Sequence, residues 1–283
     1  MTGVATGALT MLLCRMDLGL RGAAAVVNGG TGGMGRAAAE CFAEDGARVA
    51  VFGRTQSTLD ETVEVLRELG SPDAVGLRVD VVIKSQVEAA FSELGRRWGE
   101  LNILVNTVGP HQAGRIDELS DEDWVAAFEL GTMSAVRCAR AALPWLRKAA
   151  WARIVNVSAH STKRQVPVLI AYTAAKAAMT SLSKNLAKTL SKDGILVNTV
   201  SPGTFHSESV RRYVESTAGG RGIDPDDPVD AMRVIGEDFA SPCDLGRAGL
   251  PREIGAVIAF LASQRNSYMT GADVNVDGGS DFA

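Results

Sequence analysis

Short apolar runs alternate along the chain with longer stretches in which apolar residues recur at helical spacing. The runs occupy residues 23–28, 47–53, 74–79, 101–106, 153–158, 194–200 and 272–276. Each run is nearly continuous rather than alternating in polarity, which is typical of strands buried on both faces of a sheet. The repeated order of strand, helix and strand predicts an α/β fold with a doubly wound parallel sheet and helices on both faces.

Local signals indicate where several of the helices begin. The segment SDED at 120–123 places Ser120 three residues before Asp123, the spacing of a capping box. Pro251 suits the first turn of a helix over PREIGAVIAFLA. Apolar residues at steps of three, four and seven predict a further helix over 171–190, on one face of which lie Ala171, Ala174, Ala175, Ala178, Leu182, Leu186 and Leu190.

No linker or change in composition divides the chain, so we expect a single domain over residues 17–283. Residues 1–16 are interpreted as an N-terminal extension, because their apolar stretch is short and lacks the basic region of a signal peptide. The irregular stretch at about 204–248 holds the segment TAGGRGIDPDDP between two weak helical patterns. A long insertion of this kind predicts a lid over a substrate site.

Composition narrows the classes of function. The chain has 283 residues, of which 46% are apolar, and a net charge of −4 with scattered Lys and Arg, so nucleic acid is not an expected partner. No apolar run reaches the ~18 residues of a membrane helix. The four cysteines are widely spaced without a CxxC pair, which predicts neither disulfides nor a metal site and suits the reducing cytoplasm.

The first apolar run leads into a glycine-rich turn, NGGTGGMG, at residues 28–35. Gly29, Gly33 and Gly35 permit a tight turn that brings the backbone close to a pyrophosphate at the start of a helix. An unliganded βα turn or a methyltransferase would begin with a similar pattern. In its position after the first strand, the turn predicts a Rossmann-type dinucleotide site.

The end of the second apolar run indicates which dinucleotide binds. An NAD enzyme or a methyltransferase usually places Asp or Glu there to bind ribose hydroxyls, whereas this chain has Gly53 and Arg54. A guanidinium suits a 2′-phosphate. We therefore expect NADP(H) to be preferred, with NAD(H) as the alternative; a solvated surface arginine is the simpler reading of Arg54.

Six motifs in order resemble the short-chain dehydrogenase/reductase family, of its single-domain, 3-oxoacyl-reductase-like type. They are NGGTGGMG (28–35), RVDV (78–81), NTVG (106–109), YTAAK (172–176), SPGTFHS (201–207) and VNVDGG (274–279). The resemblance implies that Asp80 meets the adenine and that the SPG segment touches the nicotinamide carboxamide. The cofactor-binding residues that it implies are Gly29, Thr31, Gly33, Met34, Gly35, Arg54, Asp80, Val81, Asn106, Thr107, Val108, Gly109, Tyr172, Lys176, Pro202, Gly203, Phe205 and Ser207.

The same resemblance implies a reaction. Tyr172 would donate a proton to a ketone oxygen as hydride arrives from the nicotinamide, or accept one from a secondary alcohol in reverse. Lys176, one helical turn later, reaches the same side of the helix. Its charge, together with that of an oxidised nicotinamide, is expected to lower the pKa of Tyr172 from the ~10 of a free phenol. A homotetramer, with helices at 120–148 and 171–192 in an interface, is also implied.

The chain departs from the family at two catalytic positions. The serine expected thirteen residues before the tyrosine is replaced by Ala159, and the asparagine expected after the fourth strand is replaced by Gly131. Ser161, Ser158 and His160 are the candidates to replace the serine. Ser161 is preferred to Ser158, whose strand geometry would turn it to the opposite face. The departures also support an alternative, a degenerate cofactor-binding member that acts as a sensor or partner subunit.

The histidines and the predicted cleft walls indicate where a substrate would lie. His111, His160 and His206 each follow a predicted strand, so all three could face the cleft at the carboxyl ends of the strands. We hypothesise that at least one contacts substrate or replaces the missing serine. The cleft walls are expected to come from 110–115, 159–170 and the lid. Apolar residues there, among them Val210 and Tyr213 of the lid, predict a small-molecule carbonyl or alcohol substrate with an apolar body.

Overall fold

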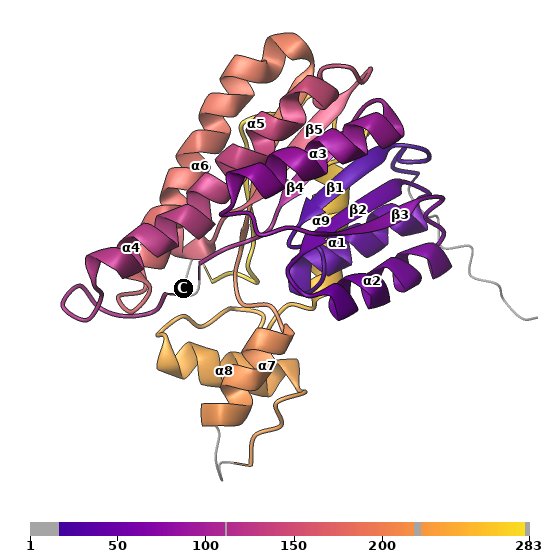
Figure 1. Cartoon of the computed structure of the whole chain (residues 1–283). Coiled ribbons are helices and arrows are strands. Elements are labelled where there is room, and N and C mark those ends of the chain that lie inside the picture. Colours follow the sequence, from indigo (N-terminus) through magenta and orange to yellow (C-terminus); the bar gives the residue numbers. More distant parts are fainter. Residues whose placement is uncertain (1–16, 111, 218–221, 281–283) are drawn as a thin grey trace, which may run out of the picture.

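The computed structural model describes residues 17–110, 112–217 and 222–280 (Figure 1). The expected N-terminal extension, residues 1–16, and His111 lie outside these residues. Within the described part of the chain, no helix is both long and apolar enough to cross a membrane.

The centre of the fold is a parallel sheet of seven strands in the order β3-β2-β1-β4-β5-β6-β7. The strands coincide with the seven apolar runs and confirm the predicted doubly wound sheet. Their bounds are β1 (Ala24–Asn28), β2 (Arg48–Gly53), β3 (Ala74–Arg78), β4 (Ile103–Asn106), β5 (Ala152–Val157), β6 (Ile195–Pro202) and β7 (Asp273–Val276).

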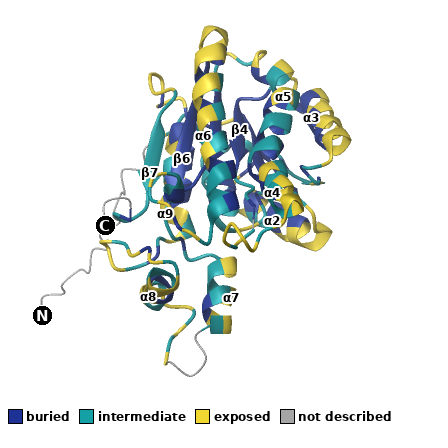
Figure 2. Cartoon of the chain, turned by 90° about the vertical axis from the view of Figure 1, so that its left-hand side faces the viewer, coloured by how far each residue is buried: buried dark blue, intermediate teal, exposed yellow. Residues whose placement is uncertain are grey.

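Helices cover both faces of the sheet. One face carries α1 (Gly33–Glu44), α2 (Gln56–Glu68) and α9 (Pro251–Leu261). The other carries α3 (Lys84–Trp98), α5 (Ser134–Leu146) and α6 (Ile170–Leu190). Figure 2 shows β4 and β6 largely buried within the fold, whereas the edge strand β7 is partly exposed. Because successive strand residues point to opposite faces, Val26 packs beneath the second group of helices and Val27 beneath the first.

The helix starts at Ser120 and Pro251 lie where the sequence indicated. Helix α4 (Asp121–Phe128) begins at a capping box, in which the Ser120 hydroxyl accepts from the backbone of Asp123. A short π-helical segment, Glu129–Met133, joins α4 to α5. Two short 3-10 helices, His160–Thr162 and Ser191–Asp193, flank the two ends of α6.

The segment predicted to be a lid contains two helices, α7 (Glu208–Thr217) and α8 (Pro228–Asp238). They project from the carboxyl-end side of the sheet, at the bottom of Figure 1, and we call them the α7–α8 unit. Val214, Ala231 and Val234 form a small apolar core within the unit. Backbone bonds from Gly249 to the Thr204 carbonyl (3.0 Å) and from Ala248 to the Pro228 carbonyl (2.9 Å) close its base.

Candidate active site

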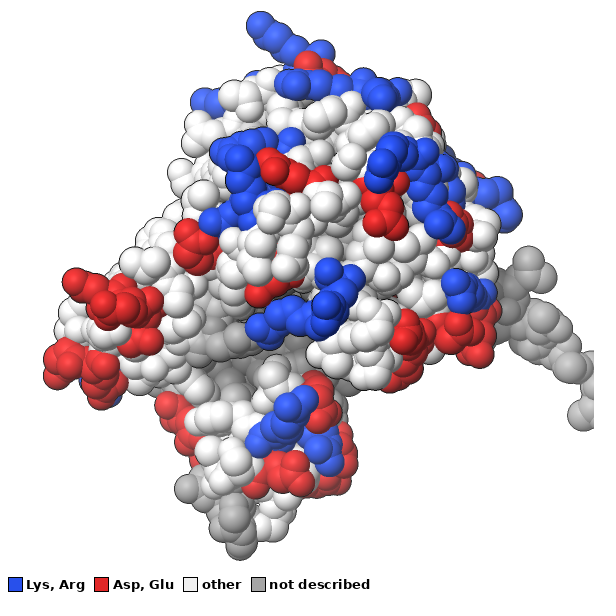
Figure 3. All heavy atoms as spheres, in the orientation of Figure 1, with Lys and Arg blue, Asp and Glu red and all other residues white. Residues whose placement is uncertain are grey.

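A cavity of about 530 Å³ opens at the carboxyl ends of β1, β2, β4 and β5. Its wall combines the glycine-rich turn, the loops after β2, β3 and β4, the start of α6 and the start of α7. In Figure 3 the surface is hollowed between the main body and the α7–α8 unit, with Lys and Arg side chains beside the hollow. The predicted site residues that line the cavity are Gly29, Thr31, Gly33, Met34, Gly35, Arg54, Asp80, Val81, Thr107, Val108, Gly109, Ser158, Tyr172, Lys176 and Ser207.

The other predicted residues do not line this cavity. Asn106 is buried within the sheet, where its Nδ2 donates to Asn156 Oδ1 over 2.8 Å. Pro202 and Gly203 lie at and beyond the end of β6, and Phe205 lines a separate cavity of about 120 Å³. Ser161 and His160 are also absent from the wall.

Several lining residues were missed by the sequence analysis. Leu130 belongs to the π-helical segment, and Glu208 and Ser209 belong to the first turn of α7. No local pattern marks them, because their place depends on how α4 and the α7–α8 unit fold back on the sheet. The remaining missed residues are Asn28, Gly32, Phe52, Gly53, Val79, Pro110 and Val157.

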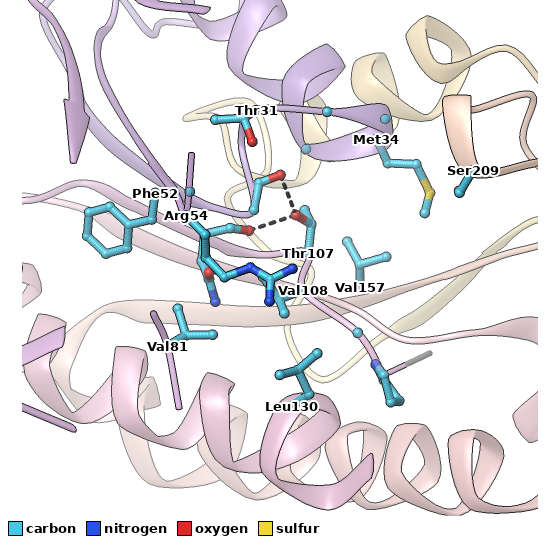
Figure 4. Close-up of a pocket in the computed structure, with 18 of the residues that line it drawn as sticks. Thr31, Met34, Phe52, Arg54, Val81, Thr107, Val108, Leu130, Val157 and Ser209 are labelled. Carbon is cyan, nitrogen blue, oxygen red and sulfur yellow. Dashed lines mark hydrogen bonds between the residues drawn. The ribbon is translucent and has the colours of Figure 1, made fainter. Parts of the chain in front are cut away.

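The glycine-rich turn packs too tightly to accept larger residues. A Cβ on Gly35 would lie 2.3 Å from the Gly29 carbonyl oxygen, and Gly29 itself has a φ of +78°. The Thr107 hydroxyl donates to the Asn28 carbonyl over 2.7 Å and so joins the turn to the loop after β4 (Figure 4). A Cβ on Gly32 would meet no atom within 4 Å, so the turn is tightly packed at Gly29 and Gly35 but open at Gly32.

Asn28 places an unsatisfied amide in the cavity wall. Its side chain is buried, and neither Nδ2 nor Oδ1 has a hydrogen-bond partner among the described residues. A buried amide without partners is costly, so a site that leaves one at the cavity wall is suited to a polar ligand or water.

Lys176 is buried, and its ammonium lies against the carboxyl ends of two strands. Its Nζ donates to the Val157 carbonyl over 2.7 Å and to the Val108 carbonyl over 3.4 Å. A Cβ on Gly109 would lie only 3.0 Å from this nitrogen, so glycine leaves the space that the ammonium needs. Burial lowers the pKa of Lys176 to about 7.

Tyr172 is half-buried and lies one helical turn before Lys176, facing the same cavity. Burial raises the pKa of its phenol to about 12. In the protein without cofactor the pKa of Tyr172 is thus shifted upward by desolvation, whereas the lowering expected from Lys176 together with an oxidised nicotinamide stays a prediction for the complex. At neutral pH the phenol therefore keeps its proton.

The two serines near Ala159 are both held by neighbouring side chains. Ser158 lines the cavity, but its hydroxyl lies 2.7 Å from Thr180 Oγ1 and 3.1 Å from the Lys176 carbonyl oxygen. Ser161 is buried and accepts a hydrogen bond from Thr173 Oγ1 over 3.0 Å. The geometry thus gives no support to the preference for Ser161 over Ser158.

The two histidines in the described residues are likewise engaged outside the cavity. His160 Nδ1 lies 3.1 Å from the Pro202 carbonyl oxygen, and its Nε2 lies 3.0 Å from Ser241 Oγ. His206 Nε2 lies 2.8 Å from the Pro225 carbonyl oxygen. The apolar lid residues Val210 and Tyr213, expected in the cleft wall, pack within the α7–α8 unit instead.

Gly131 is required by packing between the π-helical segment and α6. A Cβ there would lie 2.8 Å from the Ala175 Cβ and 3.2 Å from Pro110 Cδ. The neighbouring Thr132 hydroxyl donates to the Ala175 carbonyl over 2.7 Å, which fixes this close approach. An asparagine at position 131 would therefore displace the helix that carries Tyr172 and Lys176.

We expect the buried Lys176 to make stability depend on pH. Its folded pKa of about 7 lies below the ordinary 10.5, so between these values the unfolded chain binds more protons and stability rises with pH. Relative to Lys176→Met, the wild-type protein should gain up to ~1.4 kcal/mol per pH unit in this window. Urea unfolding at several pH values measures the difference, with Lys184→Met, an exposed lysine on α6, as the control. Parallel stability profiles for wild type and Lys176→Met would contradict the assignment.

We expect Gly131→Ala to destabilise the protein by about 1 kcal/mol or more, because overpacking outweighs the gain in helix propensity. In an Ala175→Gly background the same substitution should become neutral or stabilising. Gly236→Ala is the matched control, since a Cβ at that helical glycine meets nothing closer than 3.5 Å. Urea unfolding measures all four variants of the cycle. Equal effects of Gly131→Ala in both backgrounds would refute the steric explanation.

Comparisons with known proteins agree with this architecture. The family model described as enoyl-(acyl carrier protein) reductase matches residues 29–281. The uncharacterized oxidoreductase YvrD of Bacillus subtilis is 34% identical over 93% of this chain and 98% of its own length. L-sorbose reductase from Gluconobacter frateurii, solved with NADPH and L-sorbose, superimposes with a TM-score of 0.87 at 29% identity, covering 95% of this chain and 100% of that one.

A second solved structure, the Pseudomonas aeruginosa RhlG/NADP active-site complex, superimposes with a TM-score of 0.81 at 29% identity, covering 94% of this chain and 98% of that one. The match of the family model to most of the chain agrees with the seven-stranded sheet and with the order of the six sequence motifs. The chain therefore belongs to the short-chain dehydrogenase/reductase family and is an oxidoreductase.

Proposed function

We propose that this protein is an NADP(H)-dependent oxidoreductase that reduces a ketone or oxidises the corresponding secondary alcohol. Tyr172 acts as the acid or base, and Lys176 assists it. The observation that carries the proposal is that Tyr172 and Lys176 line the same cavity as the glycine-rich turn. The proton-transfer group and the dinucleotide cradle therefore share one space.

The residues of the cavity fit a dinucleotide. The turn after β1 has open space at Gly32 in which a ligand can approach the backbone. The buried side-chain amide of Asn28 has a donor, Nδ2, and an acceptor, Oδ1, without partners among the described residues. Gly29, Thr31, Gly33, Met34 and Gly35 would hold the pyrophosphate side, and Asp80 and Val81 the adenine side. When bound, the nicotinamide supplies or accepts the hydride.

Tyr172 and Lys176 can supply the proton that the ketone oxygen needs. The Tyr172 phenol is protonated at neutral pH, which suits donation to a ketone oxygen. The Lys176 ammonium donates hydrogen bonds to two backbone carbonyls at the cavity wall, and it would have to break these bonds to move further into the cavity. Its pKa of about 7 makes it a group that can exchange a proton near neutrality beside the phenol.

Arg54 supports the preference for the phosphorylated cofactor. Its guanidinium lines the cavity and faces it in Figure 4, and it forms no ion pair with a described residue. A free guanidinium beside the dinucleotide cradle suits a 2′-phosphate. The relatives solved with NADPH and with NADP are consistent with this choice.

The substrate end of the cavity supports a carbonyl compound with an apolar body. Pro110, Leu130 and Val157 line the same cavity as Tyr172, and Ala159 has no hydroxyl to offer a substrate. Tyr172 would then be the principal hydrogen-bond donor to the substrate oxygen. We also propose a cytoplasmic homotetramer; exposed Val125 and Phe128 on α4 support contact with another copy.

Ala159 favours a second candidate function, a degenerate member that binds cofactor without turnover. Gly131 gives it less support, because tight packing against Ala175 explains that glycine without a loss of catalysis. The two functions differ in one outcome, namely whether a ketone panel oxidises NADPH in the presence of the wild-type protein.

We expect Tyr172→Phe to reduce ketone-dependent NADPH oxidation by ~10²–10⁴-fold, because the proton donor is lost. The dissociation constant for NADPH should change by less than about twofold, since the ring still fills its place. Absorbance assays with a ketone panel and a fluorescence titration measure the two quantities. Undiminished turnover would refute the role of Tyr172. A wild-type protein that binds NADPH but reduces no ketone would favour the degenerate member.

We expect Arg54→Ala to weaken NADPH binding by about 10–100-fold, the effect of losing hydrogen bonds to a charged group. NADH binding should change little, because NADH lacks the 2′-phosphate. Arg67→Ala, an exposed arginine on α2 paired with Glu64, is the control. Comparing dissociation constants for both cofactors tests the preference, and tighter binding of NADH by the wild-type protein would reverse it.

A further inference from the structure

The turn between β5 and α6 makes contacts with four other parts of the fold. We call residues 160–164 the β5–α6 turn; it follows Ala159 and leads toward Tyr172. Its side chains reach the end of β6, strand β7, the C-terminal turn at Ser280 and the corner that follows α8.

His160 bridges two of these parts. The Pro202 carbonyl can only accept, so Nδ1, at 3.1 Å, carries the hydrogen of that bond. Nε2 lies 3.0 Å from the hydroxyl of Ser241, which is buried at 3% exposure. The imidazole therefore ties the end of β6 to the corner after α8.

Arg164 and Lys163 extend the same contact. The Arg164 guanidinium donates to the Ser280 carbonyl over 3.0 Å and to the Ala240 carbonyl over 3.3 Å. Lys163 lies 3.4 Å from the Asp273 carboxylate of β7. The turn thus holds two adjacent residues of the α8 corner, Ala240 and Ser241, and anchors itself on the sheet.

The corner that it holds is strained. Ala240 has a φ of +48°, and no other non-glycine residue in the described part of the chain has a positive φ. Helices commonly end with glycine in this conformation, because a Cβ makes it costly. The bond from Ser241 N to the Gly236 carbonyl, at 3.2 Å, closes the helix end. Such strain persists where surrounding contacts hold the backbone in place.

The corner after α8 is connected to the wall of the cofactor cavity through the α7–α8 unit. Helix α8 packs on α7 through Val214 and Val234. The chain at the start of α7 contributes Ser207, Glu208 and Ser209 to the cavity wall. Ser207 faces the glycine-rich turn, since a Cβ on Gly33 would lie 3.7 Å from the Ser207 Cβ. A shift of the corner would therefore move one wall of the cavity.

We propose that His160 is a positioning residue, which with Ser241 and Arg164 holds the α7–α8 unit against the carboxyl ends of the strands and so keeps this wall of the cofactor cavity in place. His160 is not the donor that replaces the serine absent at position 159, because both ring nitrogens are directed to this contact. The effect on cofactor binding rests on the proposed function, whereas the effect on the α7–α8 unit does not.

Hydrogen exchange of the protein without added ligand tests the structural part. His160→Ala should accelerate exchange of the α7 and α8 amides by about five- to tenfold, the factor expected from a lost hydrogen bond. Ser241→Ala removes only one hydroxyl and should give a similar increase, and the double variant should add little. Arg147→Ala, which breaks an exposed pair with Asp193, is the control and should leave these amides unchanged.

Two kinetic measurements separate positioning from catalysis. In His160→Ala and Ser241→Ala, NADPH should dissociate about five- to tenfold faster in stopped-flow fluorescence. Single-turnover hydride transfer at saturating NADPH should change by less than about twofold, because Tyr172 is untouched. A catalytic His160 predicts the reverse, a transfer slowed by ~10²-fold or more with unchanged dissociation.

Each outcome decides one question. Unchanged exchange in the α7–α8 unit of both single variants would overturn the proposal, as would slower hydride transfer with unchanged cofactor release. Faster exchange in a protein that binds neither NADPH nor NADH would support the structural contact and reject the proposed function. Ser241→Ala remains informative if His160→Ala fails to fold, because the Ser241→Ala variant keeps the hydrogen bond between His160 and the Pro202 carbonyl.

Discussion

The buried ammonium of Lys176 is the constraint on which the arrangement of the site depends. A charge without water is costly, so its nitrogen must lie against carbonyl oxygens, here those of Val157 and Val108. These carbonyls are available because parallel strands β4 and β5 end side by side. The ends of these strands therefore fix the position of helix α6, and with it the position of Tyr172, which lies one helical turn before Lys176.

The close approach of α6 to the sheet has further consequences around it. Gly109 leaves room for the ammonium, and Gly131 leaves room for Ala175. The family asparagine is therefore replaced at a position where this chain has no space for a Cβ. In the sequence, Gly131 in place of asparagine suggests a loss of catalysis. In the structure, close helix packing explains the same glycine. Ala159 is the other departure from the family pattern.

The region after Ala159 shows how one loop serves two purposes. It leads into α6, the helix that carries Tyr172, and its polar side chains contact the sheet and the corner after α8. Residues considered as substitutes for the serine are engaged in these contacts or in contacts with α6. In the proposed reaction, Tyr172 would therefore be the principal hydrogen-bond donor to the substrate oxygen.

The sequence by itself determined the seven strands, the glycine-rich turn and the Tyr172–Lys176 pair. These features are local, because apolar runs, glycine spacing and a helical turn each act over a few residues. It did not determine where Ser158, Ser161 and His160 direct their polar atoms, or that Leu130 and Glu208 would line the cavity. Those outcomes depend on contacts between segments far apart in the chain, such as His160 with Ser241 and Gly131 with Ala175. The upward shift of the Tyr172 pKa was also decided by tertiary structure, because it comes from burial, which the spacing of residues does not reveal.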